Sequence, residues 1–166
     1  MKYSHKLSDA IHILAYVEIY QDGDLSSQSI AGSIESNASL VRRLMSLLVK
    51  ADLLESRPGT IAPKLARPAE QISVLDVYQA LDTDQQLLHI DEKTNPQCLV
   101  GANIQSALND AYDQVQKAAE DQMAQIKLAG INADILANSA QGNALKNKVR
   151  IKIIFYHTLF FCGLVR

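Results

Sequence analysis

Apolar residues recur at intervals of three and four along the first fifty positions, with short polar stretches between them. Such spacing is typical of amphipathic helices that bury one face. The pattern predicts three helices, namely one over residues 4–20, a short one capped by Ser26 or Ser27, and one capped by Ser36 or Asn37. A leading helix followed by two helices across a tight polar turn predicts a helix-turn-helix unit.

Two short strand candidates follow, at residues 53–56 and 60–65, with Arg57-Pro58-Gly59 as the turn between them. Pro63 lacks the N–H that a sheet ladder needs, so the second strand belongs at a sheet edge. A hairpin directly after a helix-turn-helix is a wing. Farther on, Ser73 and Asp76 have the spacing of a capping box, which predicts the start of another short helix.

The helical periodicity returns from Leu99 to about Leu128, with a polar face opposite the apolar stripe. About thirty residues at 1.5 Å each span about 45 Å, which is longer than a small domain is wide. Packing back on its own domain is the alternative, but this length favours a second copy of the chain as the partner. The candidate dimerisation residues are Ile104, Leu108, Tyr112, Val115, Ala119 and Met123.

The pattern as a whole predicts a mainly α protein with a small β-hairpin wing and a long C-terminal dimerisation helix. We expect a winged helix-turn-helix domain over 1–81 and a polar linker over 82–98. Residues 99–137 would hold the dimerisation helix and a following short helix, and residues 138–166 a tail to which we assign no function. The tail is too short and too charged for a comfortable membrane span, and no signal peptide opens the chain, so we expect a cytoplasmic protein.

The formal net charge of −2 conceals a basic segment. Residues 36–67 contain six basic and two acidic side chains, a local charge of +4 that leaves −6 for the rest of the chain. Arg42 and Arg43 lie near the start of the third helix, where the helix dipole disfavours positive charge. The segment could be ordinary solvated surface, but phosphate groups outside the helix would account for this placement.

Four stretches in a fixed order now support a family resemblance: "DAIHILAYV", "SSQSIAGSI", "SNASLVRRLMSLLVKADLL" and "KLARPAEQISVLDVYQAL". From about Tyr3 to Leu136 the chain resembles the Rrf-two (Rrf2) family of bacterial winged-helix transcription regulators, which includes IscR, NsrR and CymR. The resemblance implies sequence-specific binding of a homodimer to double-stranded DNA at a near-palindromic operator. We find no catalytic triad, phosphate-binding glycine loop or metal-ligand spacing, and therefore predict no enzymatic activity.

The match to the family's motifs assigns candidate DNA contacts. It places Asn37, Ser39, Arg42 and Arg43 on the groove-facing side of the third helix. An arginine there can bridge O6 and N7 of guanine or pair with a phosphate. Ser26, Ser27 and Gln28 begin the second helix and suit a phosphate, while Arg57 at the wing tip suits a phosphate or a narrow minor groove. Each serine could instead cap its helix, and for Ser27 we favour capping.

The chain departs from the family's pattern at its cysteines. Cluster-binding members carry three closely spaced cysteines before the long helix, whereas here that region holds Cys98 alone and Cys162 lies far along the chain. An iron–sulfur cluster usually takes four protein ligands, so we predict no cluster and no cofactor, and expect a repressor that senses an unknown small-molecule or redox effector. Cys98 is a candidate thiol sensor if it caps the long helix, or else a small buried apolar side chain. The alternative function is a winged-helix interaction scaffold that does not bind DNA specifically.

Overall fold

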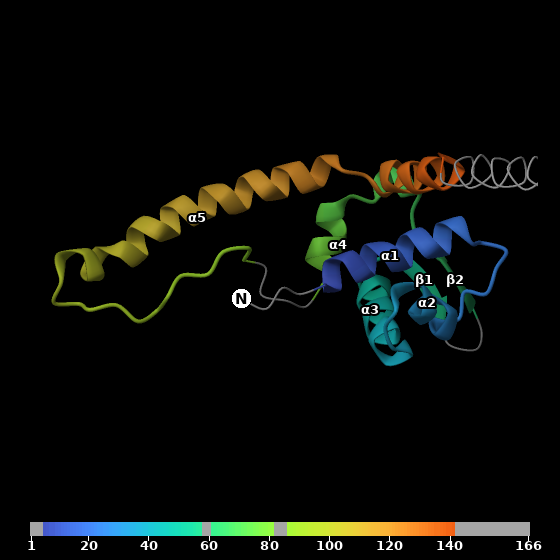
Figure 1. Cartoon of the computed structure of the whole chain (residues 1–166), viewed down its shortest axis with the longest axis horizontal. Coiled ribbons are helices and arrows are strands. Elements are labelled where there is room, and N and C mark those ends of the chain that lie inside the picture. Colours follow the sequence, from blue (N-terminus) through green and yellow to red (C-terminus); the bar gives the residue numbers. More distant parts are fainter. Residues whose placement is uncertain (1–4, 58–60, 82–85, 142–166) are drawn as a thin grey trace, which may run out of the picture. The chain divides into compact units, whose positions relative to one another are not determined.

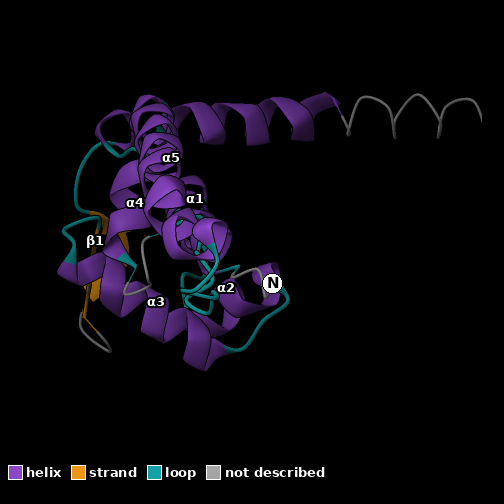
Figure 2. Cartoon of the chain, turned by 90° about the vertical axis from the view of Figure 1, so that its left-hand side faces the viewer, coloured by secondary structure: helices purple, strands orange, loops and turns teal. Residues whose placement is uncertain are grey.

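The computed structural model describes residues 5–57, 61–81 and 86–141. The described chain is mainly helical and contains one β-hairpin, which confirms the predicted fold class (Figures 1 and 2). Its elements are α1 (Lys6–Ile19), α2 (Ser27–Ile34), α3 (Ala38–Lys50), β1 (Leu54–Arg57), β2 (Ile61–Leu65), the 3₁₀ turn η1 (Ala69–Gln71), α4 (Val74–Ala80) and α5 (Leu99–Gln125). A further helical stretch covers residues 128–141. The predicted tail lies outside the described residues from position 142 on.

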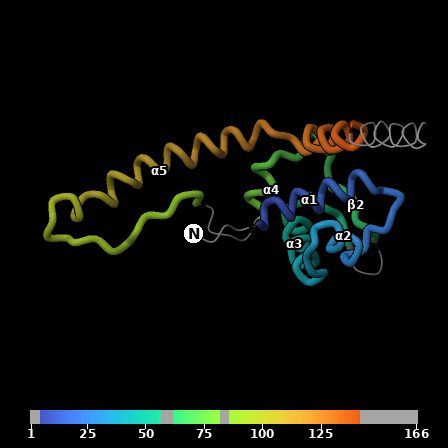
Figure 3. Tube along the Cα trace, in the orientation of Figure 1, coloured from blue at the N-terminus to red at the C-terminus, as the bar shows by residue number. Residues whose placement is uncertain are grey.

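Two compact units make up the chain, Met1–Ala129 and Gly130–Arg166. The first unit contains all the labelled elements, and its core forms where α1, α2, α3 and α4 meet (Figure 3). The side chains with no exposed surface are Ala10, Ile13, Leu14, Ile30, Leu48, Leu53 and Ile72. These residues come from α1, α2 and α3 and from the segments before β1 and before α4, so one continuous core fixes how α3 is presented. We call residues 5–81 the head.

The turn between α2 and α3 is closed by backbone hydrogen bonds. Glu35 ends α2 in the left-handed region, with φ of 54°, and the Ser36 N–H then donates to the Ala31 carbonyl at 2.9 Å. A residue in this conformation reverses the chain immediately after a helix. Asn37 starts the next helix as its N-cap, which decides between the two predicted candidates.

The hairpin has an antiparallel register in which Glu55 pairs with Lys64. The two side chains form an ion pair of 2.8 Å across the strands. β2 pairs with β1 alone among the described residues, in agreement with the edge position that Pro63 requires. Each strand begins one residue later than predicted, and Arg57 belongs to β1 rather than to the turn.

The predicted capping box at α4 is confirmed. The Ser73 hydroxyl oxygen accepts from the Asp76 N–H at 3.1 Å, and the Asp76 carboxylate accepts from the Ser73 N–H at 2.7 Å. The same region also ends the long helix earlier than predicted. Residues 126 and 127 leave the helix, because Val74 N–H donates to the Ile126 carbonyl and Leu128 N–H donates to the Ile72 carbonyl, each at 2.9 Å, which forms a bridge between Ser73 and Lys127. α5 therefore stops at Gln125 rather than near Leu128.

Candidate nucleic-acid interface

α3 separates its apolar and polar side chains onto two faces. Val41, Leu44 and Leu48 are buried in the core. The opposite face exposes Ser39, Arg42, Arg43, Ser46 and Lys50. Since these positions follow each other at intervals of three and four, they form one continuous polar strip along the helix. The sequence prediction omitted Ser46 and Lys50, although Ser46 lies seven residues after Ser39 and hence on the same face.

Within residues 5–57, 61–81 and 86–141, the cations of this strip have no intramolecular counterion. No ion pair to Arg42, Arg43 or Lys50 occurs within the described residues. Two other cations of the basic segment are engaged, because Lys64 pairs with Glu55 and Arg67 pairs with Asp76. The uncompensated charge of the segment is therefore concentrated on α3, as binding to a polyanion requires.

Asn37 lies at the start of this strip, where its side chain can both cap α3 and contact DNA. Its side-chain oxygen accepts from the Leu40 N–H at 2.8 Å and so caps α3. Bidentate recognition of adenine uses both the oxygen and the NH₂ group of an asparagine. With the oxygen engaged in the cap, the exposed NH₂ group is better suited to donate to a phosphate.

The start of α2 is capped by Ser26, one of the two predicted candidates, so the capping role that we favoured for Ser27 over a phosphate contact was wrong. The Ser26 hydroxyl oxygen accepts from the Ser29 N–H at 3.2 Å, whereas Ser27 is the first residue inside the helix. Asp24 adds a carboxylate that accepts from the Ser29 hydroxyl and from the Ser26 N–H. These hydrogen bonds, that of Ser29 first, lower the pKa of the Asp24 carboxyl, which favours a negative charge beside this helix end.

A phosphate at α2 must therefore lie close to the Asp24 carboxylate, and repulsion weakens the case for this position. Gln28 remains exposed and Ser27 is half-buried. Arg57 is the last residue of β1 and precedes the predicted wing tip, whose residues 58–60 lie outside the described part of the chain. The structure thus brings Asn37, Ser39, Arg42 and Arg43 together on one surface, and locates Ser26, Ser27, Gln28 and Arg57 on neighbouring elements.

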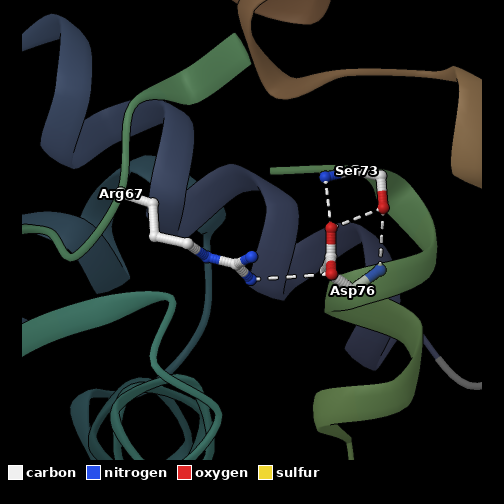
Figure 4. A network of polar contacts seen from close by, with 3 residues as sticks. All are labelled: Arg67, Ser73 and Asp76. Atoms are coloured by element: carbon white, nitrogen blue, oxygen red, sulfur yellow. Dashed lines mark hydrogen bonds and ion pairs between the residues drawn. The ribbon is translucent and has the colours of Figure 1, made fainter. Parts of the chain in front are cut away.

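Arg67 links the segment after the wing to the start of α4. Its guanidinium lies 3.5 Å from the Asp76 carboxylate, which also completes the capping box with Ser73 (Figure 4). Burial raises the pKa of Asp76, but the Ser73 hydrogen bonds and the Arg67 charge outweigh it and leave this pKa below its ordinary value of 3.8. The contact therefore ties Arg67 to the serine-led start of α4.

Comparison with known proteins identifies the architecture. The model of the Rrf2 family, described as iron-dependent transcriptional regulators, matches residues 3–134. The chain belongs to the Rrf2 family. It is 40% identical over 126 residues to YwnA of Bacillus subtilis, a candidate HTH-type transcriptional regulator, and the match covers 76% of this chain and 93% of YwnA. This Rrf2 protein is therefore a transcriptional regulator, a function that implies binding to DNA.

Solved structures support the same assignment. A crystal structure of a candidate DNA-binding protein is 39% identical, with a TM-score of 0.61 and coverage of 76% of this chain and 97% of the other. CymR, the global cysteine regulator of B. subtilis, is 18% identical with a TM-score of 0.58, and covers 80% and 97% of the two chains. The second likeness shows the fold alone. The family consists of regulators rather than enzymes, in agreement with the sequence prediction.

Cys98 is the N-cap of α5 and its side chain is exposed, so the interpretation as a buried apolar residue was wrong. The backbone N–H groups of Gly101 and Val100 lower the pKa of its thiol, although neither forms a cap hydrogen bond of full geometry. The family's description raises the question of iron. The described residues contain no group of three histidine, cysteine or acidic side chains close enough to hold a metal ion, and one thiol does not fit a cluster.

Within the described residues, no helix combines the length and the apolar character that crossing a membrane requires.

Proposed function

We propose that this Rrf2 protein is a homodimeric repressor that reads a near-palindromic operator with two copies of α3, without an iron–sulfur cluster. The observation that carries the proposal is the exposed strip of α3, where Arg42 and Arg43 have no counterion in the described structure. Helices presented in this way enter the major groove with their N-terminal half.

We assign base recognition and phosphate contact to different residues of the strip. Arg42 and Arg43 each carry a planar guanidinium that can grip guanine through two hydrogen bonds. Ser39 and the NH₂ group of Asn37 lie nearer the helix start and suit the DNA backbone. Ser26, Ser27, Gln28 and Arg57 are proposed as flanking contacts, with the α2 residues weakened by the Asp24 carboxylate.

The proposed dimer rests on α5. A helix of 27 residues has no buried side chain within the chain, and Val115 is 49% exposed. Leaving apolar surface of this length in water is unfavourable, and a second copy of the same helix would cover it. The proposed seam contains Ile104, Leu108, Tyr112, Val115, Ala119 and Met123.

The signal is proposed to be a thiol-reactive or small-molecule effector rather than iron. The exposed N-cap position of Cys98 and the lowered pKa of its thiol both favour the reactive thiolate form. Replacement by Ser keeps an N-cap side chain, so a response to a disulfide reagent that the wild type shows and Cys98→Ser lacks would support this role. Equal responses would exclude it.

The test of DNA reading begins with genomic fragments selected by the wild-type protein. Arg42→Ala and Arg43→Ala should each weaken binding by about 1–3 kcal/mol if they contact bases. Loss at one base position indicates base readout, whereas uniform loss with a shallower dependence on salt indicates phosphate contact. Lys64→Ala is the matched control, because its charge is already paired with Glu55.

The scaffold alternative gives a different result in the same assay. A protein-interaction module would bind duplex DNA weakly and without preference among fragments. Wild-type-like binding by the Arg42→Ala/Arg43→Ala double variant would overturn α3 as the reading helix, while failure of the wild type to select any fragment would overturn the proposed function itself.

A further inference from the structure

The segment between the head and α5 lies back along α5 as an extended strap, which we define as residues 86–98. Leu87 N–H donates to the Gln116 side-chain oxygen at 2.9 Å. The Gln105 side-chain NH₂ donates to the carbonyls of Asp91 and Glu92, at 3.1 and 2.9 Å. Two glutamines of α5 therefore hold the main chain of the strap at two separate places.

The spacing of these two glutamines lets both of them contact one extended segment that runs along α5. Eleven residues at 100° each come within about 20° of three full turns, so Gln105 and Gln116 lie on the same face of α5, separated by about 16 Å along its axis. The strap residues from Leu87 to Glu92 cover about the same length when extended. The strap thus runs antiparallel to α5 (Figure 3), and the two contacts fix its register.

A third contact fixes the end of the strap. The Asn95 side chain accepts from the Gln97 N–H at 3.0 Å, and the Asn95 carbonyl accepts from the Cys98 N–H at 3.2 Å. This turn packs directly on Gly101, where an added Cβ would lie 2.2 Å from the Asn95 oxygen. The strap is accordingly anchored near residues 101, 105 and 116 of α5.

Gln116 also connects the strap to the head. Its NH₂ group lies 3.4 Å from the hydroxyl of Tyr78 on α4 and 2.6 Å from the Glu120 carboxylate. Tyr78 is buried, and α4 packs against both α1 and α3. One planar amide therefore contacts the strap at its oxygen and α4 at its nitrogen.

We propose that Gln116 is a positioning residue for DNA binding, which couples the strap at Leu87 to α4 at Tyr78 and thereby to the placement of α3. This inference rests on the proposed function, since its output is the affinity for DNA. Gln105 binds the strap at Asp91 and Glu92, and no hydrogen bond joins it to α4 in the described part of the chain, so it supplies the matched control within the same helix.

The experiment compares Gln116→Leu, Gln116→Glu and Gln105→Leu with the wild type, after circular dichroism has shown that each is folded. Hydrogen–deuterium exchange of the DNA-free proteins reports on the strap and α4, and fluorescence anisotropy reports the affinity for a wild-type-selected DNA fragment. Gln116→Glu keeps the acceptor for Leu87 but loses the NH₂ group that faces Tyr78, so it serves as the second variant if Gln116→Leu does not fold.

We expect Gln105→Leu to accelerate exchange in the strap alone and to leave DNA affinity within about twofold of the wild type. Gln116→Leu should accelerate exchange in the strap and in α4 and lower the affinity for DNA about tenfold. Gln116→Glu keeps the strap contact, so it should accelerate exchange in α4 alone and lower the affinity by a similar factor. In a double-mutant cycle with Tyr78→Phe, the two losses of affinity should fall short of additive, because both variants remove the same contact.

Two results would overturn the coupling: unchanged exchange in α4 of the Gln116 variants, or a loss of affinity no larger than that of Gln105→Leu. If the wild type selects no DNA at all, the proposed function fails while the exchange measurements still decide whether Gln116 links the strap to α4.

Discussion

The head and α5 are both built from amphipathic helices, yet they use their apolar residues in opposite ways. In the head, Ile13, Leu48 and Ile72 have no exposed surface, and a single core joins all the surrounding elements. α5 contains no buried residue, and Leu99 at its start is 84% exposed. The same three-and-four spacing therefore accompanies a complete core in one region and an apolar face that is at most half-buried in the other.

This contrast shows where the chain depends on other contacts. The head buries its apolar side chains in one core, to which Leu128 from beyond α5 also contributes, and its polar strip on α3 stays exposed. α5 gains order from hydrogen bonds of the strap and from α4, contacts that cover only part of its circumference. The remaining apolar face is the part of the molecule that a second copy would complete.

Charges placed on α5 give the largest expected effect. Leu108→Glu with Val115→Glu would put two carboxylates from each chain into the proposed seam, where burial without partners is strongly unfavourable. Sedimentation velocity at micromolar concentration should show monomers in place of dimers.

Lys117→Glu is the control for this prediction, because it changes the net charge by the same two units on the exposed polar side of α5. It should leave the dimer intact. A double variant that stays dimeric with unchanged affinity would show that the seam lies elsewhere.

Truncating the core of the head should have the next largest effect. Leu48→Ala removes a side chain with no exposed surface and should lower the free energy of unfolding by about 2–5 kcal/mol. Leu99→Ala, at a position 84% exposed, should change it by less than about 0.5 kcal/mol. Both variants are unfolded with urea in the Leu108→Glu/Val115→Glu background, which excludes a contribution from association. Equal losses of unfolding free energy for Leu48→Ala and Leu99→Ala would contradict the contrast between the head and α5.

The sequence predicted those features that local chemistry controls. Apolar periodicity located α1, α3 and α5, and the Ser73–Asp76 spacing identified a capping box that the structure confirms. The polar face of α3 follows from the same periodicity, because the buried positions leave the arginines outside. Local patterns were sufficient here since helices and their caps involve residues at most four positions apart.

Features that depend on distant partners could not be predicted. α5 ends at Gln125 because the next residues pair with the backbone around Ser73, more than fifty positions earlier. The strap looks like an ordinary polar linker, since nothing in its composition indicates that Gln105 and Gln116 will bind its main chain. Ser26 and Ser27 are equally good caps by type, and only the backbone geometry decides between them.

The junction between the wing and α4 should show a moderate effect that depends on pH. Asp76→Asn removes the carboxylate shared by Ser73 and Arg67 and should cost about 0.5–2 kcal/mol at neutral pH, as the loss of a helix cap does. Because folding lowers the pKa of Asp76, its contribution is present above the unfolded value near 3.8 and is lost as the pH falls through the lower folded value.

The stability difference between the wild type and Asp76→Asn should therefore shrink below pH 3.8 in urea titrations. Glu55→Gln removes the more exposed ion pair with Lys64 and should cost less than about 1 kcal/mol. A difference for Asp76→Asn that stays constant from pH 7 to pH 3 would show that the carboxylate is not stabilised in its charged form.

The smallest expected effect on stability comes from replacing two helical glycines, Gly32 in the head and Gly101 in α5, whose surroundings differ. Alanine is favoured over glycine inside a helix by about 0.5–1 kcal/mol. Gly32 in α2 has nothing within 4 Å of an added Cβ, so Gly32→Ala should raise the free energy of unfolding by about that amount. At Gly101 the added Cβ would lie 2.2 Å from the Asn95 oxygen, so Gly101→Ala should lose this gain and accelerate hydrogen exchange in the strap. The preference of helices for alanine is common to both variants, so the difference between their free energies of unfolding isolates the contact of the strap with α5. If Gly101→Ala raised the free energy of unfolding as much as Gly32→Ala and did not accelerate exchange, the strap would not pack against Gly101.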